Sequence, residues 1–395
     1  MARASEEATR AGTPRGGGNQ VDRNEPLIEV KNLNVQFKTQ LGLVSALNGV
    51  TFTVPRGKVL GVVGESGSGK TITGLAIMQL VPSPGKVMSG EILLHQRPGE
   101  PPVDLLGYER AGTEMRKIRG DQVGMIFQEP MTSLNPCYTV GNQIEEAILL
   151  HQTKDKTEAK EKTIDILRRV GMPNPKKVYG TYPHELSGGM RQRAMIAMAL
   201  SCSPALLIAD EPTTALDVTT EAQILDLIME LQEAGHMSVM FITHNMGVVA
   251  QICDEVAVMY LGRIVEQASV EDIFDDPKHP YTAALLRSIP RLGTSTKRLE
   301  VIEGAVPDPY ARVPGCPFHP RCPSAIAGTC DVLMPAVATF DGQRPHLVRC
   351  HLYEESRSGA RPEVSGLVVG EGADSTLAET GEASASRNAV DGGGE

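Results

Sequence analysis

The sequence predicts an α/β domain with a largely buried parallel sheet, followed by a smaller module of different character. Short apolar runs rich in branched residues, such as VLGVVG, VGMIFQ, LLIADE and VMFITH, alternate with stretches of helical periodicity. Strands that are buried on both faces have such continuous apolar runs, and helices between them connect parallel neighbours. After about residue 269 this alternation fades, proline becomes frequent and cysteines gather, which predicts a separate C-terminal module containing cysteines.

The N-terminal elements follow from local patterns. The stretch LIEVKNLNVQF places Leu33, Val35 and Phe37 on one face of a strand. The run VLGVVG leads into a glycine-rich loop, and a helix is expected to begin at Lys70. Towards the end of the α/β domain, VAVMYLGRIVEQ contains a Gly262-Arg263 turn and predicts a hairpin.

The middle of the domain is expected to hold a helical subdomain, spanning residues 138–190. A solvated stretch, TKDKTEAKEK, lies between apolar residues at helical spacing. These apolar residues are Ile144, Ile148, Ile164, Leu167 and Val170.

Composition limits the possible partners. Of the ten net negative charges, six belong to residues 354–395, which hold nine acidic and three basic side chains. No basic cluster is evident, Trp is absent and aromatic residues are few, so a nucleic-acid partner is not expected. Residues 1–26 and 354–395 are poor in apolar side chains, and both segments are expected to be disordered.

The N-terminal segment lacks the apolar centre of a secretory signal, and the most apolar run of the chain is too short to cross a bilayer. The chain is therefore expected in the cytosol, with at most a peripheral role at a membrane. In that compartment structural disulfides are not expected among the seven cysteines. Cys137, Cys202 and Cys253 are interpreted as small buried residues.

The glycine-rich loop GESGSGKT has the pattern of a phosphate-binding P-loop. Its glycines let the backbone wrap around phosphates with N–H groups pointing inward, and the following helix presents its positive end to the anion. Lys70 is expected to reach the β- and γ-phosphates, and Thr71 offers a hydroxyl to Mg²⁺. The residues expected to bind ATP here are Gly64, Glu65, Ser66, Gly67, Ser68, Gly69, Lys70 and Thr71.

An acidic pair closes another apolar run, LLIADEP. Asp210 follows four apolar residues, so it is expected at a strand end, where its carboxylate would hold the Mg²⁺ shell. Glu211 is next and would polarise the attacking water. With Lys70 and Mg²⁺, this base is a minimal set for ATP hydrolysis, because phosphoryl transfer depends mainly on positioning and charge stabilisation.

The stretch LSGGM lies between these two motifs, and the three motifs in this order resemble the ATPase subunits of ABC transporters. The resemblance implies an ABC-type P-loop ATPase core over residues 27–268. It also implies that Ser187, Gly188 and Gly189 contact the γ-phosphate held by the P-loop of a second, homologous ATPase subunit. Met190 stands where the commonest form of the family has Gln.

Four further positions match the same family. The resemblance implies that Gln128 senses Mg²⁺ and the membrane partner, that Asp217 organises the dimer interface, and that His244 contacts the γ-phosphate and the attacking water. Phe37 matches the aromatic residue that stacks on adenine. Its alternating strand equally supports a position in the core.

The segments GMIFQEPMTSLNP, HPYT and VPGCPFHPRCP resemble the ATPase subunits of dipeptide and oligopeptide importers. This resemblance implies a peripheral subunit on the cytoplasmic face of the membrane that powers peptide uptake. Its partners would be two permease subunits, a second ATPase subunit in a heterodimer and, indirectly, an extracytoplasmic peptide-binding protein. The alternatives are the same motor role in an importer of nickel or another solute, and a soluble ABC ATPase without a transport role.

The C-terminal module, residues 269–353, carries four grouped cysteines: Cys316, Cys322, Cys330 and Cys350. Five, seven and nineteen residues separate them, which is wider than the usual spacing of structural zinc ligands. Four thiolates suit an iron–sulfur cluster, and the importer resemblance implies a 4Fe–4S cluster here. Zinc and free thiols are the alternatives.

Overall fold

The computed structural model describes residues 26–128, 133–214, 216–289, 302–311, 313–342 and 345–354, all within one compact unit. The segments expected to be disordered lie outside this range, apart from the terminal residues Pro26 and Glu354. Residues 129–132, part of the EPMTSLNP stretch, also lie outside it. Among the described residues, no helix combines the length and the apolar character needed to cross a membrane.

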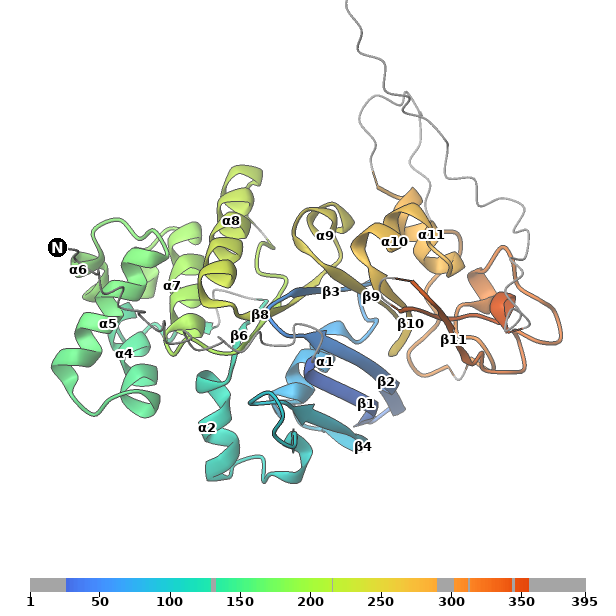
Figure 1. Cartoon of the computed structure of the whole chain (residues 1–395), viewed down its shortest axis with the longest axis horizontal. Coiled ribbons are helices and arrows are strands. Elements are labelled where there is room, and N and C mark those ends of the chain that lie inside the picture. Colours follow the sequence, from blue (N-terminus) through green and yellow to red (C-terminus); the bar gives the residue numbers. More distant parts are fainter. Residues whose placement is uncertain are drawn as a thin grey trace, which may run out of the picture. The chain divides into compact units, whose positions relative to one another are not determined.

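The larger of two sheets has eight strands in the order β11-β12-β10-β9-β3-β8-β7-β6 (Figure 1). Five of them run parallel: β3 (Val59–Val63), β6 (Val123–Ile126), β7 (Leu206–Asp210), β8 (Ser238–Thr243) and β9 (Glu255–Tyr260). Every residue of β3, β6, β7 and β8 is buried, which confirms the parallel strands predicted from apolar runs.

The second sheet is antiparallel, in the order β2-β1-β4-β5. Its strands are β1 (Pro26–Thr39), β2 (Gly42–Pro55), β4 (Gly85–Leu94) and β5 (Val103–Asp104). Leu33 and Val35 are buried as the alternation predicts, and together with Leu47 and Ile77 they belong to a core that this sheet shares with the large one.

The helices connect the strands and cover the sheet. They are α1 (Lys70–Ile77), α2 (Thr113–Asp121), α4 (Val140–His151), α5 (Lys156–Arg169), α6 (Pro175–Tyr179), α7 (Gly188–Leu200), α8 (Val218–Gly235), α9 (Met246–Ile252), α10 (Val270–Asp275) and α11 (Pro280–Arg287). The helix predicted from Lys70 begins there. Side-chain oxygens of Thr139, Asp155 and Ser269 cap α4, α5 and α10.

Helices α4, α5 and α6 lie together in Figure 1 and include most of the segment expected to be helical. Four of the five apolar residues named for this segment are fully buried, whereas Ile164 is only half-buried. The buried residue of that turn is Ile166 instead, because helix α5 turns Ile166 and Leu167 towards the core.

The C-terminal part extends the large sheet. Strand β10 (Arg263–Ser269) forms the predicted hairpin with β9, and β12 (His346–Arg349) pairs antiparallel with β10. Strand β11 (Val337–Phe340) completes the edge. The segment containing the cysteines therefore contributes strands to the same sheet from which the glycine-rich loop extends.

Two of the three isolated cysteines are buried as expected, namely Cys202 and Cys253. The prediction for Cys137 was wrong, because this residue is exposed. It lies in the loop before α4, where its backbone N–H donates to the Asn135 side chain.

Candidate functional site

Several of the residues expected to act on ATP lie in a row because of the strand order. In the sequence β3-β8-β7-β6, the carboxyl ends of the parallel strands lead into Gly64, His244, Glu211 and Gln128 in turn. Loops at this edge of an open α/β sheet are where ligands bind. The structure therefore brings together motifs that are far apart in the chain.

The glycine-rich loop connects β3 to α1, and all three of its glycines have a positive φ. Gly67 has a φ of +79°, which favours glycine, and a Cβ on Gly64 would lie 2.1 Å from the Met259 carbonyl oxygen. Helix α1 begins after Gly69 without a side-chain cap, so its first N–H groups are free to meet an anion. Ser66 and Gly67 are exposed, whereas Ser68 is buried.

Lys70 lies inside the loop that it is expected to serve. Its Nζ donates to the carbonyl oxygens of Gly64 at 2.7 Å and Glu65 at 3.0 Å. Burial lowers the pKa of Lys70, while the carboxylates of Glu211, Asp210 and Glu65 act in the opposite direction. The ammonium group is thus held on backbone oxygens, from which a phosphate could draw it.

Asp210 and Thr71 are adjacent, as a shared Mg²⁺ site requires. The Thr71 hydroxyl donates to Asp210 Oδ1 at 3.1 Å, and Asp210 is the last residue of the buried strand β7. Burial raises the pKa of Asp210 to about 6, against the hydrogen bond from Thr71. Hydroxyl and carboxylate oxygens are the ligands that Mg²⁺ prefers.

Glu211 is the centre of the polar contacts at this edge. Its carboxylate accepts from Gln128 Nε2 at 3.1 Å and from the Thr214 hydroxyl at 3.0 Å, and contacts His244 Nδ1 at 3.1 Å. Burial raises the pKa of Glu211, but the hydrogen bonds from His244 and Thr214 outweigh it, so the net shift is downward. The carboxylate is therefore ionised at neutral pH, as a proton acceptor must be.

The backbone of Glu211 is also unusual, with a φ of +44° in a residue other than glycine. Its N–H donates to the Ile242 carbonyl of the neighbouring strand β8 at 2.9 Å. Strained backbone of this kind gathers at functional sites. Thr214 was not anticipated from the sequence, although it follows the acidic pair by only three positions.

The LSGGM stretch forms the start of helix α7. Ser187 Oγ accepts from the Met190 N–H at 3.4 Å and caps the helix, while Gly188 is open to solvent. A Cβ on Gly189 would lie 3.1 Å from the Thr220 side chain. Within the part of the chain that the structure describes, no hydrogen bond joins Ser187–Gly189 to the glycine-rich loop.

Asp217 and Phe37 have structural contacts of their own. Asp217 caps helix α8 by accepting from the Thr220 N–H at 3.0 Å and from the Thr220 hydroxyl at 2.8 Å. Phe37 is half-buried, packs against the core between the sheets and lies beside Gly85 of strand β4. The half-buried position is compatible with both interpretations of Phe37, as a core residue and as an adenine platform.

Contacts from the C-terminal part to Glu65 were missed by sequence reasoning. Arg321 forms a double ion pair with the Glu65 carboxylate, at 2.7 and 3.0 Å, and the Tyr281 hydroxyl accepts from the Glu65 N–H at 2.8 Å. Tyr281 belongs to the HPYT motif and Arg321 precedes Cys322. Both segments had stood out in the sequence, but nothing in their composition indicated contact with the loop.

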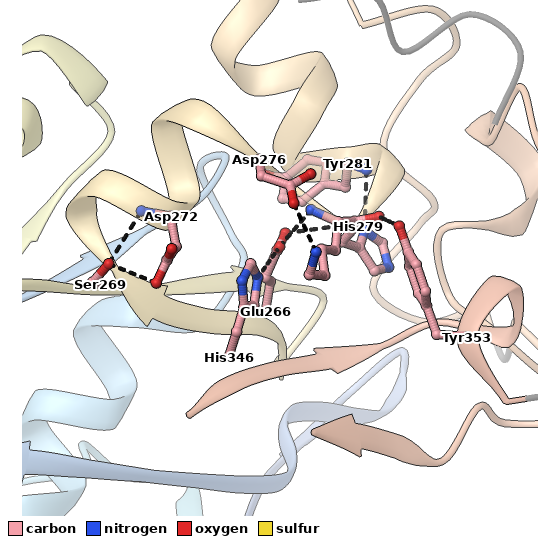
Figure 2. Close-up of polar contacts among 9 residues, drawn as sticks. Glu266, Ser269, Asp272, Asp276, His279, Tyr281, His346 and Tyr353 are labelled. Carbon is pink, nitrogen blue, oxygen red and sulfur yellow. Dashed lines mark hydrogen bonds and ion pairs between the residues drawn. The ribbon is translucent and has the colours of Figure 1, made fainter. Parts of the chain in front are cut away.

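A buried carboxylate anchors this C-terminal part. Glu266 of β10 is 1% exposed and accepts from the backbone N–H groups of Lys278 and His279, at 2.6 and 3.0 Å, and it contacts His346 Nε2 at 2.7 Å (Figure 2). Burial lowers the pKa of His279 to about 4, so its neutral ring accepts the Tyr281 N–H at Nδ1. Glu266 thus connects β10, β12 and the start of α11.

The four grouped cysteines share one region. Cys316, Cys330 and Cys350 are buried and Cys322 is partly buried, and the Cys316 N–H donates to the Cys330 carbonyl at 2.8 Å. Burial, and to a lesser extent the other thiols, raise the pKa of Cys350 to about 12. Among the described residues, however, no three His, Cys, Asp or Glu side chains are grouped closely enough to hold a metal ion.

A glycine-rich loop after one parallel strand, with an Asp-Glu pair ending a nearby strand of the same sheet, defines a P-loop nucleoside triphosphatase. Comparisons with known proteins specify the family. Residues 47–214 match the model of the ABC transporter family, and residues 265–330 match that of the oligopeptide/dipeptide transporter C-terminal region.

Among curated relatives, a putative peptide import ATP-binding protein of Brucella melitensis is 48% identical over 84% of this chain and 98% of its own. The oligopeptide transport ATP-binding protein AppD of Bacillus subtilis is also 48% identical, over 83% and 97%. The dipeptide transport ATP-binding protein DppD of Haemophilus influenzae is 47% identical, over 82% and 95%.

Solved structures support the same assignment. The bacterial ABC transporter cassette MJ0796, in a dimeric structure, matches with a TM-score of 0.54 and 26% identity over 62% of this chain and 98% of that one. The chain belongs to the ABC transporter ATP-binding proteins, in the branch that carries the oligopeptide/dipeptide transporter C-terminal region.

Proposed function

We propose that this protein binds and hydrolyses MgATP and thereby powers the import of dipeptides or oligopeptides. The observation that carries the hydrolytic part is the row of loops at the carboxyl ends of β3, β8, β7 and β6. It places a phosphate loop, an acidic pair and a polar set around one carboxylate at the same edge. Phosphoryl transfer to water depends mainly on positioning and charge stabilisation, which this set of groups can supply.

Each group at this edge has a role in the proposal. Lys70 would leave the backbone carbonyls of the loop for the β- and γ-phosphates, and the loop amides from Gly64 to Thr71 would surround them. Thr71, Asp210 and Gln128 would hold Mg²⁺, which when bound supplies charge neutralisation for the phosphates. Phe37 would stack on adenine.

Glu211 would act as the general base that accepts a proton from the attacking water. Its downward pKa shift keeps it ionised, and Thr214 and Gln128 hold its orientation. His244, whose side chain is 65% exposed, would contact the γ-phosphate and the same water. The contact between His244 and Glu211 supports this pairing.

We further propose that two such subunits share their ATP sites. Ser187, Gly188 and Gly189 start an exposed helix end away from contacts with their own phosphate loop, which suits binding to the γ-phosphate on a homologous partner. Asp217 would organise the interface. It caps α8 by accepting from the Thr220 N–H, and Gly189 lies next to the Thr220 side chain. A dimeric structure of the ATP-binding cassette MJ0796 bound to ADP and Pi, 25% identical, is consistent with pairing of two such subunits.

The proposed organisation is an ATPase domain at 27–268, with a helical subdomain at 138–190, and a C-terminal module at 269–353. The subunit would lie peripherally on the cytoplasmic face of the membrane. There Gln128 and the EPMTSLNP stretch, partly outside the described residues, would receive a coupling helix from one of the two permease subunits. An extracytoplasmic peptide-binding protein would supply the substrate.

The choice of peptides rests on the named relatives and on the match to the C-terminal region. The test is uptake by proteoliposomes that contain this chain with its partner ATPase, permeases and binding protein. We expect ATP-dependent accumulation of a labelled dipeptide or a longer peptide. Accumulation of Ni²⁺ without either peptide would contradict the substrate assignment while leaving the ATPase role intact.

For Cys316, Cys322, Cys330 and Cys350 we propose a 4Fe–4S cluster. Four thiols, three of them buried, are the donor set that such a cluster requires, and thiolate binding to iron would offset the unfavourable burial. The cysteine segment would have to draw the thiols closer than they are here.

Anaerobic purification followed by analysis of iron, sulfide and zinc tests the cluster. We expect about four irons and four sulfides per chain, with visible absorbance that dithionite bleaches. Exchanging Cys330 for Ser should remove them, whereas exchanging the exposed Cys137 for Ser should not. Zinc in place of iron, or no metal at all, would contradict the proposal.

A further inference from the structure

Among the described residues, two side chains of the C-terminal part form hydrogen bonds with Glu65 of the phosphate loop, one to its side chain and one to its backbone. The guanidinium of Arg321 takes both carboxylate oxygens of Glu65, at 2.7 and 3.0 Å. The Tyr281 hydroxyl accepts the Glu65 N–H at 2.8 Å. A bidentate pair of this kind fixes orientation as well as charge.

The two contacting side chains are themselves held rigidly. The Tyr281 ring is fully buried against Tyr260 and Phe318, with centroids 4.7 and 5.3 Å apart. The Arg321 side chain is only 3% exposed and donates to the Tyr260 hydroxyl at 3.4 Å. The positions of both groups are thus set by packing, and Glu65 conforms to them.

The negative charge of Glu65 also opposes the binding of an anion to the loop. Its carboxylate lies in the stretch expected to surround a polyanion, and like charges a few ångströms apart repel at an effective dielectric well below that of water. The Glu65 carbonyl oxygen accepts from Lys70 Nζ at 3.0 Å. Displacement of Glu65 would therefore remove one of the two carbonyl oxygens that hold Lys70, the residue expected to reach the phosphates.

We propose that Arg321 is a positioning residue for nucleotide binding, which neutralises Glu65 and, with Tyr281, holds the phosphate loop in its binding shape. Arg321 acts through Glu65 and does not need to touch ATP. The C-terminal module is thereby a working part of the ATP site. The inference rests on the proposed function only in that this loop binds ATP.

A double-mutant cycle on the full chain tests this, with ATP affinity measured by equilibrium binding in the presence of Mg²⁺. R321A is expected to weaken ATP binding about tenfold, because the Glu65 charge is left uncompensated. When Glu65 is already Gln, adding R321A should cost little ATP affinity. The double variant R321A/E65Q should therefore bind ATP nearly as well as E65Q alone. Coupling of this sign is what a charge-neutralising pair produces.

Salt and conservative variants give independent readouts. The loss in R321A should shrink as ionic strength rises, since screening weakens the repulsion. R321K keeps the charge but loses the double hydrogen bond, so it should fall between wild type and R321A. Y281F, which removes only the acceptor for the Glu65 N–H, should weaken ATP binding less than R321A and show no rescue by E65Q.

Lys278→Ala is the matched control, because Lys278 forms an ion pair with Asp276 in the same C-terminal part, and none of its hydrogen bonds or ion pairs among the described residues reaches the loop. Its ATP affinity should equal that of wild type. The proposal is overturned if R321A binds ATP as wild type does, or if R321A/E65Q binds as weakly as R321A. Failure of the wild-type chain to bind ATP would instead contradict the proposed function itself.

Discussion

Exchanging Glu211 for Gln is expected to lower ATP turnover by the assembled transporter roughly 10²- to 10⁴-fold while leaving ATP binding intact. Glutamine has nearly the same shape and still meets Thr214 and Gln128, but its amide cannot accept a proton from water. The phosphate loop and the Asp210–Thr71 pair are untouched by the change. Phosphate release at saturating ATP measures the effect, and equilibrium ATP binding provides the comparison.

The control is Glu230→Gln, the same chemical change at an exposed position on helix α8. Its turnover should match that of wild type. If hydrolysis survived in the Glu211 variant at a comparable rate, Glu211 would not be the general base, and His244 would become the group to test. Loss of ATP binding together with turnover would show instead that the carboxylate supports the loop rather than the chemistry.

Exchanging Glu266 for Ala is expected to lower the free energy of unfolding by about 3–5 kcal/mol, the usual cost of removing one partner from a buried charged set. Two backbone N–H groups and the Nε2 of His346 would lose their acceptor inside the fold. Since Glu266 connects β10, β12 and the start of α11, the C-terminal part should loosen first. At the usual scaling for a chain of this size, the melting temperature should fall by about 5 °C.

Thermal unfolding followed by circular dichroism measures this change. Glu100→Ala provides the control, because Glu100 pairs with Arg97 at the surface, where both side chains are more than half exposed. That variant should shift the melting temperature by no more than about 2 °C. An equal effect of the two substitutions would contradict the anchoring role of Glu266.

Much of the candidate ATP site could be predicted because each of its motifs consists of residues that are close together in the chain. A buried strand followed by glycines and a Lys-Thr pair can wrap a phosphate wherever it occurs, and an acidic pair after an apolar run falls at a strand end. Lys70, Thr71, Asp210 and Glu211 were all named on such grounds. The exposure of Cys137 could not be predicted in this way, because the type of a residue says little about its burial in an irregular loop.

Contacts between distant parts of the chain could not be predicted from local patterns. His244 meets Glu211 only because β8 lies beside β7 in the sheet. The sequence placed HPYT and the cysteine segment in a separate module. In the structure that module adds two strands to the large sheet, next to β10.

By itself the sequence determined the class of the fold, the phosphate loop and the acidic pair, since each depends on neighbours within a few positions. Only the tertiary structure decided that Glu65 pairs with Arg321, which is 256 positions away in the chain. The physical reason is that this pairing depends on sheet order and on the packing of Tyr281 against Phe318, which no local pattern encodes. In the folded chain, Glu65 of the glycine-rich loop is therefore held by residues of the C-terminal part.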